Sequence, residues 1–128
     1  MIKFYRTDHK VLSEITEYED NMWVCMTKPT VDETKLIAED FEIDLADVRA
    51  ALDDEESSRV EVEDGYTLIL VDIPSIEMRN EREAYTTIPL GIILVKDILI
   101  TVCAEDTPVL DAFIESKVKE FSTKKRMR

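Results

Sequence analysis

Three closely spaced apolar segments in the second half of the sequence restrict the fold more than any other feature. Residues 66–73, 86–95 and 98–103 carry apolar side chains at consecutive positions rather than only at every second one. A strand of this kind is buried on both faces, so its sheet needs cover above and below. With helical patterns before and after these segments, the sequence predicts an α/β fold, in which a mixed, largely antiparallel sheet is sandwiched between helices.

Two tight turns set the order of these strands. Residues 59–63 alternate valine with glutamate and lead into Asp64-Gly65, where glycine readily adopts the positive φ that a two-residue turn needs. A second two-residue break, Lys96-Asp97, separates the last two apolar segments. We therefore expect two hairpins, with residues 66–73 at the centre of the sheet. The polar residues 75–85 show no clear periodicity and fit either an exposed loop or a continuation of the strands.

The first quarter of the sequence has weaker strand patterns. Residues 1–5 and 10–15 alternate only in part between apolar and polar side chains. Residues 22–26 form a continuous apolar run that stops at Lys28-Pro29, as a buried strand leading into a helix would. Trp23 lies in this run without basic residues around it, so a core position is favoured over a nucleic-acid stacking platform.

Helix-start signals follow at three places. Thr30 and Glu33 have the spacing of a capping box, and the stripe of the helix that follows comprises Leu36, Ile37 and Phe41. Asp44 can cap a second short helix, whose inward residues are Leu45, Val48 and Leu52. Thr107-Pro108 marks a final helix, whose apolar face comprises Val109, Leu110, Phe113, Ile114, Val118 and Phe121.

The charge distribution limits the classes of partner. The chain of 128 residues has a formal charge of −13, but residues 117–128 contain six basic residues and one acidic residue, so residues 1–116 carry −18. Such a body repels nucleic acids and anionic lipids, and it attracts cations or a basic protein. Solubility alone would also account for this composition.

Enzyme chemistry finds little support in the sequence. The single histidine, His9, lies in a polar turn, and the two glycines are too few for a phosphate-binding loop. Cys25 and Cys103 are far apart in apolar runs, so we expect them to be reduced core residues rather than ligands of a metal. We therefore predict that the chain is not an enzyme and requires no cofactor.

One acidic run is a candidate for cation binding. Asp53, Asp54 and Glu55, followed by Glu56, come directly after the second predicted helix. Hard cations such as Mg²⁺ prefer carboxylate oxygens, and the negative end of a helix favours a cation nearby. The alternative is a solvated helix end, because the spacing and the glycine of an EF-hand are missing.

Taken in order, several landmarks resemble the N-terminal domain of the CorA family of magnesium and divalent-cation transporters. They are Trp23, Pro29-Thr30 with Glu33, Phe41-Glu42-Ile43, Leu52, Arg59-Val60-Glu61, Glu63-Asp64-Gly65-Tyr66, Ile92-Ile93-Leu94-Val95 and Thr101. The resemblance covers about residues 22–126. Its closing part, residues 121–126, is similar to the passage into the stalk helix of the family. This implies a single cytoplasmic domain over residues 1–121 and the basic start of the stalk helix at residues 122–128, before the transmembrane segments.

The resemblance implies a regulatory domain that lies at the cytoplasmic face of the cell membrane and contributes to subunit assembly and gating. The whole protein would be a homopentamer of identical subunits. Mg²⁺, or Co²⁺, Ni²⁺ or Zn²⁺, would be transported or weakly bound, and the membrane would be reached only through helices beyond Arg128. Members of the family bind regulatory Mg²⁺ at an acidic pair whose positions are Arg49-Ala50 here, which marks a divergent branch. The alternative is a free-standing acidic protein-interaction module without a role in ion transport.

Overall fold

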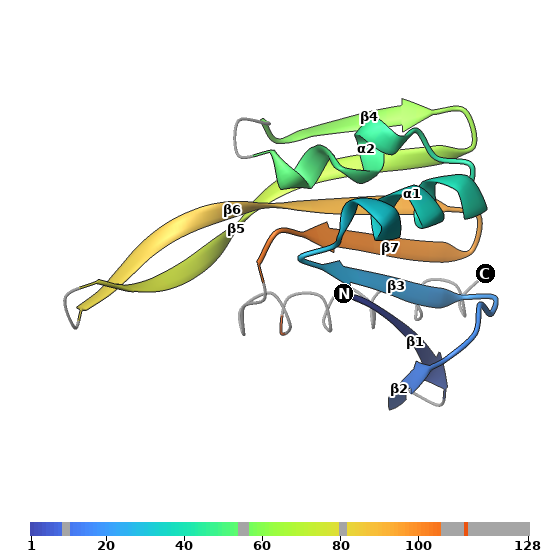
Figure 1. Ribbon diagram of the computed structural model, residues 1–128, viewed down its shortest axis with the longest axis horizontal. Helices are drawn as coiled ribbons and strands as arrows, with labels where there is room; N and C mark the ends of the chain where they lie inside the picture. The colour runs from blue at the N-terminus through green and yellow to red at the C-terminus, as the bar shows by residue number, and fades with distance from the viewer. Residues whose placement is uncertain (9–10, 54–56, 80–81, 106–111, 113–128) are drawn as a thin grey trace.

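The described part of the chain folds around a mixed β-sheet, with the described helices packed on one side (Figure 1). The computed structural model describes residues 1–8, 11–53, 57–79, 82–105 and 112. In chain order the described elements are β1 (Ile2–Asp8), β2 (Val11–Ile15), β3 (Met22–Thr27), α1 (Val31–Asp40), α2 (Leu45–Val48), the 3-10 helix η1 (Ala50–Leu52), β4 (Arg59–Glu63), β5 (Tyr66–Arg79), β6 (Arg82–Val95) and β7 (Ile98–Cys103).

Seven of the described segments pair in the order β2-β1-β3-β7-β6-β5-β4. The pairing of β3 with β7 is parallel, and Trp23 lies opposite Leu99 there. All other neighbours in this order are antiparallel. The prediction of a mixed, largely antiparallel sheet is therefore confirmed.

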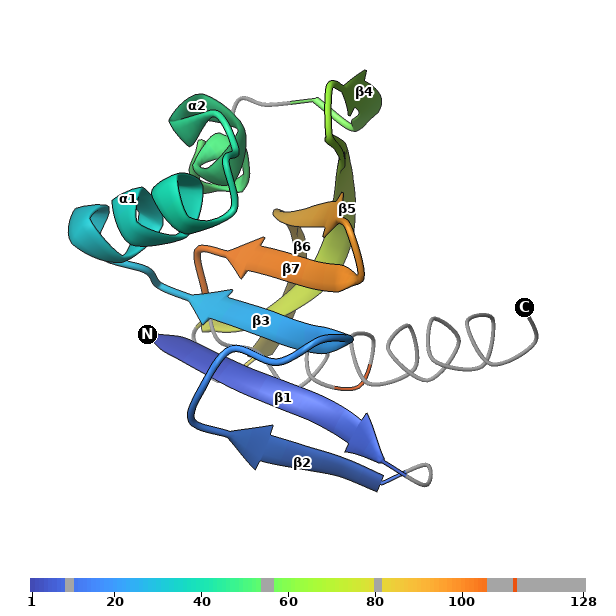
Figure 2. The same cartoon turned by 90° about the vertical axis from the view of Figure 1, so that its right-hand side faces the viewer.

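The helical cover on one face of the sheet is also present. Figure 2 shows α1 and α2 on the same side of the strands. The predicted helix that begins at Thr107-Pro108, and with it the second layer of the sandwich, lies outside the described residues apart from position 112. The same holds for His9 and for residues 122–128. Those parts of the sequence analysis stay predictions.

The main core lies between the sheet and the helices. Its buried members include Met22, Val24, Met26, Ile37, Val48, Leu68, Ile93, Ile100 and Val102. The predicted helix start is confirmed, because Thr30 Oγ1 accepts a hydrogen bond from the Glu33 backbone amide at 3.1 Å. The prediction for Leu36 is wrong: its side chain is 48% exposed. Ile37 is buried as predicted and Phe41 packs half-buried against the core, while Thr34 and Ala38 complete the inward stripe.

The second helical segment is shorter and more irregular than the sequence indicated. Asp44 caps α2 as predicted, accepting from the Ala46 amide at 3.0 Å, but α2 ends at Val48 and η1 follows. Here η1 lies close against β6. A Cβ placed on Gly91 would stand 3.1 Å from the Ala51 Cβ, so the small residues let η1 approach the sheet backbone.

The opposite face of the sheet carries a second apolar cluster that includes Trp23, Ile73, Leu90 and Leu99. Tyr5 stacks on Trp23 with 4.9 Å between the ring centroids. The buried Trp23 Nε1 donates a hydrogen bond of 2.8 Å to Thr101 Oγ1. The core position predicted for Trp23 is thus confirmed, and its indole joins β3 to β7.

The two cysteines are free thiols, as predicted. Cys103 is buried, whereas Cys25 is half-buried. Burial raises the pKa of the Cys103 thiol, which keeps it protonated and unreactive at neutral pH.

The strand predicted for the sheet centre lies elsewhere. Within β5, residues 66–70 pair with β4, which is an edge strand of the described sheet, and β7 takes the central place in the strand order. On β4 the valines face away from the helices, and Val60 and Val62 are 65% and 80% exposed. A strand that is apolar on both faces can therefore lie next to the edge strand. The edge strand pairs only with the backbone of β5, so burial of the two faces of β5 does not require further strands beyond it.

Beyond the sheet, β5 and β6 continue as a two-stranded ribbon (Figure 1). They pair along their entire length, from Tyr66 opposite Val95 to Arg79 opposite Arg82. In contrast, β4 reaches only to Leu70 on one side, and β7 reaches only to Leu90 on the other. Of the two alternatives for residues 75–85, the structure has continued strands at residues 75–79 and 82–85. Of the helices in the described residues, none has the length and apolarity that a membrane crossing requires.

The hydrogen bond between Trp23 and Thr101 yields a stability prediction. Thr101→Val keeps the side-chain shape but leaves the indole N–H buried without its acceptor, which costs about 1–3 kcal/mol. Urea denaturation followed by circular dichroism measures this loss. Thr67→Val, at a half-buried position on the same sheet face, should change the free energy of unfolding by less than about 0.5 kcal/mol. Equal losses in the two variants would contradict the importance of this bond.

The start of α1 yields a pH prediction. The Thr30 backbone amide and the N-terminal ammonium lower the pKa of the Glu33 carboxyl, and both donate to Glu33 Oε1, at 2.8 and 2.9 Å. Since folding favours the ionised form, this stabilisation is complete above the ordinary carboxyl pKa and is lost as the pH falls through the lowered one.

Glu33→Gln should therefore lower the stability by about 0.3–1 kcal/mol at pH 7, and its difference from the unsubstituted chain should vanish as the pH falls through the lowered pKa of Glu33. Thermal melts at neutral pH and on both sides of that pKa make the comparison. Glu17→Gln, at an exposed loop position, is the matched charge control. A difference for Glu33→Gln that persists at low pH would show that the carboxylate charge is not the cause.

Candidate metal centre

Three carboxylates meet between α2 and the edge strand β4. Asp47 comes from α2, and Glu61 and Glu63 come from β4. One carboxylate oxygen from each lies within 4.8 Å of the other two. Asp47 and Glu61 are half-buried, whereas Glu63 is exposed. We call these three residues the α2–β4 carboxylate cluster.

The local sequence explains why these side chains converge. Alternation along β4 places Glu61 and Glu63 on the face that looks toward the helices, since Glu61 is in register with the core residue Leu68. On the helical side, the cap at Asp44 fixes the first turn of α2, and Asp47 follows three residues later. The short helix thus holds its carboxylate above the edge strand.

Tyr66 holds Asp47 in place. Its hydroxyl donates to Asp47 Oδ2 at 2.5 Å and accepts from the Asp44 backbone amide at 3.3 Å. Burial raises the pKa of Tyr66 to about 12, and the hydrogen bond to Asp47 and the negative charges of Asp47 and Glu63 act in the same direction. The phenol therefore remains a protonated donor throughout the physiological pH range.

Arg59 partly compensates the negative charge. Its Nε donates to Glu61 Oε1 at 2.6 Å, in an ion pair whose side chains are 30% and 35% exposed. Three carboxylates and one guanidinium leave a net charge of −2 at this place. Two carboxylates 4.8 Å apart repel each other by about 1 kcal/mol in water-like surroundings. A bound cation would relieve that repulsion.

Chemically, the cluster offers a hard cation a small set of oxygen ligands. Mg²⁺ accepts one or two carboxylates and keeps several of its waters, whereas Ca²⁺ takes six to eight oxygens. At one oxygen each, the three carboxylates supply fewer ligands than a Ca²⁺ ion takes. The arrangement therefore suits a hydrated, weakly held ion of the Mg²⁺ type.

The acidic run predicted from the sequence lies apart from this cluster. Asp53 is exposed directly after η1, and it is not a member of the α2–β4 carboxylate cluster. Asp54, Glu55 and Glu56 lie outside the described residues. The proposed metal role of Asp53, Asp54 and Glu55 therefore stays a prediction.

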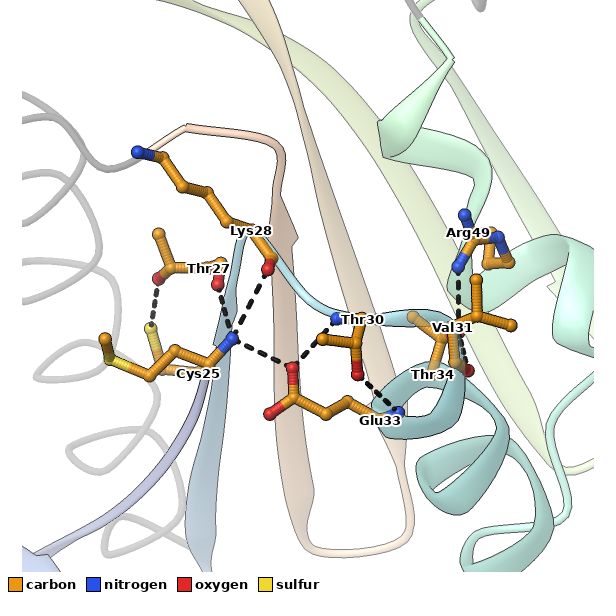
Figure 3. A network of polar contacts seen from close by, with 9 residues as sticks. Cys25, Thr27, Lys28, Thr30, Val31, Glu33, Thr34 and Arg49 are labelled. Carbon is orange, nitrogen blue, oxygen red and sulfur yellow. Dashed lines mark hydrogen bonds and ion pairs between the residues drawn. The ribbon is translucent and has the colours of Figure 1, made fainter.

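Arg49 and Ala50 both contribute to the packing of the helices. Figure 3 shows Arg49 reaching from the end of α2 to α1, where its Nη1 donates to Thr34 Oγ1 at 2.9 Å. The Thr34 hydroxyl in turn donates to the Val31 carbonyl at 2.8 Å. Ala50 is 5% exposed. A guanidinium that ties two helices together and a buried methyl group offer no ligand to a cation.

Sequence reasoning missed Asp47, Glu61, Glu63 and Tyr66 as a group. The alternation of residues 59–63 is visible in the sequence, but apolar residues of an alternating strand normally face the core. Here the valines are the exposed ones, so the glutamates face the helices. The signal that could have found the cluster is Asp47 in the first turn of α2, taken together with the two glutamates of the edge strand β4.

Comparison with known proteins identifies a family. Residues 18–126 match the family model described as CorA-like Mg²⁺ transporter protein. No curated protein sequence matches the chain.

Three similar solved structures share the fold. The complete CorA magnesium transporter from Methanocaldococcus jannaschii has a TM-score of 0.67 at 19% identity, over 98% of this chain and 38% of that one. The soluble domain of the same transporter has a TM-score of 0.71 at 21% identity, over 90% and 45%. The ZntB cytoplasmic domain from Vibrio parahaemolyticus has a TM-score of 0.64 at 15% identity, over 93% and 49%. The chain thus spans less than half the length of each.

The geometry generates a prediction for cation binding. Titration with Mn²⁺, a paramagnetic substitute for Mg²⁺, should broaden amide resonances of α2 and β4 first, with a dissociation constant of about 1 mM or weaker. The double variant Glu61→Gln with Glu63→Gln should remove this broadening.

The control is Asp53→Asn, which should leave the broadening of α2 and β4 unchanged. If the first signals to broaden are those next to Asp53, and Asp53→Asn removes the effect, the acidic run predicted from the sequence is the better cation site. Tight stoichiometric binding of Mg²⁺ in calorimetry would contradict both assignments.

Proposed function

The chain belongs to the family of CorA-like Mg²⁺ transporter proteins, and on this premise we propose that it is the cytoplasmic regulatory domain of a divalent metal-ion transporter. The family match over residues 18–126 carries the proposal. The likeness of its fold to the CorA soluble domain supports it. The ion transported is Mg²⁺, or another divalent cation such as Co²⁺, Ni²⁺ or Zn²⁺, and the domain lies at the cytoplasmic face of the cell membrane.

The anionic body provides a physical basis for cation sensing. Residues 1–116 carry −18, and a field of this sign raises the local concentration of divalent cations. The α2–β4 carboxylate cluster adds a place where a hydrated ion would lower repulsion. Each ion held there removes part of the charge that keeps two copies of the domain apart.

Gating then follows from the contacts between copies. In the proposed homopentamer, cation binding lowers the repulsion between neighbouring anionic domains and so favours the arrangement in which they lie closer. A ligand can shift such an equilibrium only by its difference in affinity for the two arrangements. Weak binding at several equivalent subunits is sufficient, because the differences in affinity combine across the assembly.

This mechanism differs from the one that the family's acidic pair would provide. Arg49 and Ala50 stand at those positions, and Arg49 is engaged with Thr34. We therefore propose that regulation in this chain depends on the general anionic field and the α2–β4 carboxylate cluster. Asp53, Asp54 and Glu55 are the alternative carboxylates.

A second candidate is an acidic interaction module that docks a basic protein and has no part in ion transport. The charge of −18 on residues 1–116 favours it as much as it favours cation sensing. The two functions differ in what the gene must encode. A transporter needs two apolar stretches of about 20 residues after Arg128, with Gly-Met-Asn between them, and an interaction module does not.

The experiment that tests the proposed function begins with the gene. We expect the apolar stretches in the sequence downstream of Arg128. In membrane vesicles that contain the full gene product, ion flux should depend on the Mg²⁺ concentration on the side that faces this domain. In the double variant Glu61→Gln with Glu63→Gln, the midpoint of that dependence should rise severalfold.

Glu17→Gln is the control in the vesicle experiment, because it removes a charge away from the cluster. Its midpoint should match that of the unsubstituted protein. A gene product without membrane segments would end the proposal of a transporter. A flux whose Mg²⁺ dependence is unchanged in the double variant would end the role of the α2–β4 carboxylate cluster.

A further inference from the structure

We propose that the outer edge of β4 binds an extended segment of another protein in which apolar residues alternate with basic ones. The segment pairs with β4 as a further strand of the sheet. Its apolar side chains cover Val60 and Val62 on one face, and its basic side chains meet Glu61 and Glu63 on the other. The inference goes beyond the proposed function, because this edge is present whether or not the chain serves ion transport.

The first argument is the backbone of β4. Its residues, Arg59–Glu63, pair with β5 on one side, and no strand of the described residues pairs with them on the other. Figure 1 shows β4 as the outermost labelled strand, at the end of the sheet opposite β2. The outward amides and carbonyls of such an edge can pair with another chain. Main-chain hydrogen bonds of this kind supply affinity when a peptide adds to a sheet.

The second argument is an apolar strip on the face of the sheet that points away from the helices. Val60 and Val62 are 65% and 80% exposed. Val60 is in register with Ile69, and Ile69 with Ile92, which packs against the second apolar cluster. The strip thus continues from a buried cluster to an exposed end at β4. Apolar side chains of an added strand would cover the two valines.

The third argument is the charge on the opposite face of β4. The α2–β4 carboxylate cluster gathers Asp47, Glu61 and Glu63 there, and Arg59 compensates one of the three charges. Side chains of an added strand on this face would be direct neighbours of the two glutamates. Opposite charges at such cross-strand positions stabilise the pair, whereas like charges destabilise it. This face therefore favours basic side chains in the partner.

Together the two faces specify a sequence pattern. Side chains alternate between the faces along a strand, so a partner strand meets valine and carboxylate in turn. A uniformly basic segment would leave the valines uncovered, and a uniformly apolar one would leave the carboxylates without a counter-charge. Charged residues on an edge strand also disfavour pairing with unsuitable strands. Only the alternation of apolar and basic residues satisfies both faces.

The charge of the domain favours another protein over a second copy of this chain as the occupant. Residues 1–116 carry −18, so two copies repel each other, and each would bring the same glutamates to the contact. A basic segment is attracted by the same field, which also speeds its association. The partner is thus defined by its chemistry, as an extended cationic segment with apolar residues at alternate positions.

Binding of designed peptides tests the proposal. The probe is a short fluorescein-labelled peptide that alternates lysine with valine, called the lysine–valine peptide, and fluorescence anisotropy measures its affinity for the chain. A peptide of the same composition, with its lysines in one block and its valines in another, should bind about tenfold more weakly or worse. A peptide that alternates glutamate with valine should not bind. In nuclear magnetic resonance spectra, the amide signals of β4 should shift first.

N-methylation of the peptide separates strand pairing from general attraction between charges. Along an extended strand, the amides of alternate residues point to the same edge. One lysine–valine peptide is therefore methylated at its lysine amides and another at its valine amides. Since only the edge that faces β4 needs free amides, one of the two peptides should lose binding and the other should keep it.

Matched valine variants locate the apolar contact. Val60→Thr with Val62→Thr keeps β-branched side chains on β4 but makes them polar, and it should weaken binding of the lysine–valine peptide severalfold. Val31→Thr, at a 52% exposed position on α1, should leave the affinity unchanged. Circular dichroism verifies that each variant keeps its fold.

A charge exchange tests the acidic face. Glu61→Lys with Glu63→Lys should reverse the preference, so that the peptide alternating glutamate with valine binds and the lysine–valine peptide does not. Glu17→Lys with Asp20→Lys makes the same change of total charge at exposed loop positions. This control should keep the preference for the lysine–valine peptide.

The proposal is overturned if the lysine–valine peptide does not bind, if its block isomer binds equally, if both methylated peptides bind, or if the first shifts are at β2. Dimers that Val60→Thr with Val62→Thr weakens in sedimentation experiments, without peptide binding, would make a second copy the occupant and overturn it as well. Absence of peptide binding leaves the transporter domain in place. A gene without membrane segments would end the transporter domain and leave the peptide result valid.

Discussion

The parallel pairing of β3 with β7 is the constraint on which the rest of the structure depends. It joins the N-terminal strands β1 to β3 to the C-terminal hairpins, so that one sheet contains both ends of the described chain. Parallel neighbours need a crossover connection, and the segment between them contains α1, α2 and η1. This crossover lays the helices on one face of the sheet. It also brings α2 beside β4, where the candidate metal centre lies.

Much of this fold could be predicted from local patterns. The capping box of Thr30 and Glu33, the cap at Asp44 and the turn at Gly65 all depend on residues a few positions apart, and the structure has each of them. Strand order depends on distant parts of the chain, and there the prediction failed. The apolar residues 66–73 indicated a central strand, but β5 lies beside the edge strand β4. An apolar segment specifies that its faces are covered and does not specify how many strands lie beyond it.

The candidate site was harder to predict than the fold, for a related reason. Consecutive acidic residues such as Asp53 and Asp54 are easy to notice, yet Asp47 and Glu61 are brought together only by the packing of α2 over β4. The position of a charge relative to a sheet face depends on which face is buried. On β4 the valines are the exposed residues, so the glutamates face the helices, which is the reverse of the usual orientation of an alternating strand. That Arg49-Ala50 stand at the positions of the family's acidic pair stays a prediction from counting between landmarks, and the structure shows that Arg49 bonds to Thr34.

The bond between Trp23 and Thr101 has a consequence for how the folding of this chain can be observed. Trp23 pairs with Leu99, 76 positions later in the sequence, and contacts of such long separation form slowly because a large loop must close first. The chain has a single tryptophan, and its indole stacks on Tyr5 and binds a residue of β7. Its fluorescence therefore reports the joining of the two halves of the sheet rather than the formation of any one hairpin.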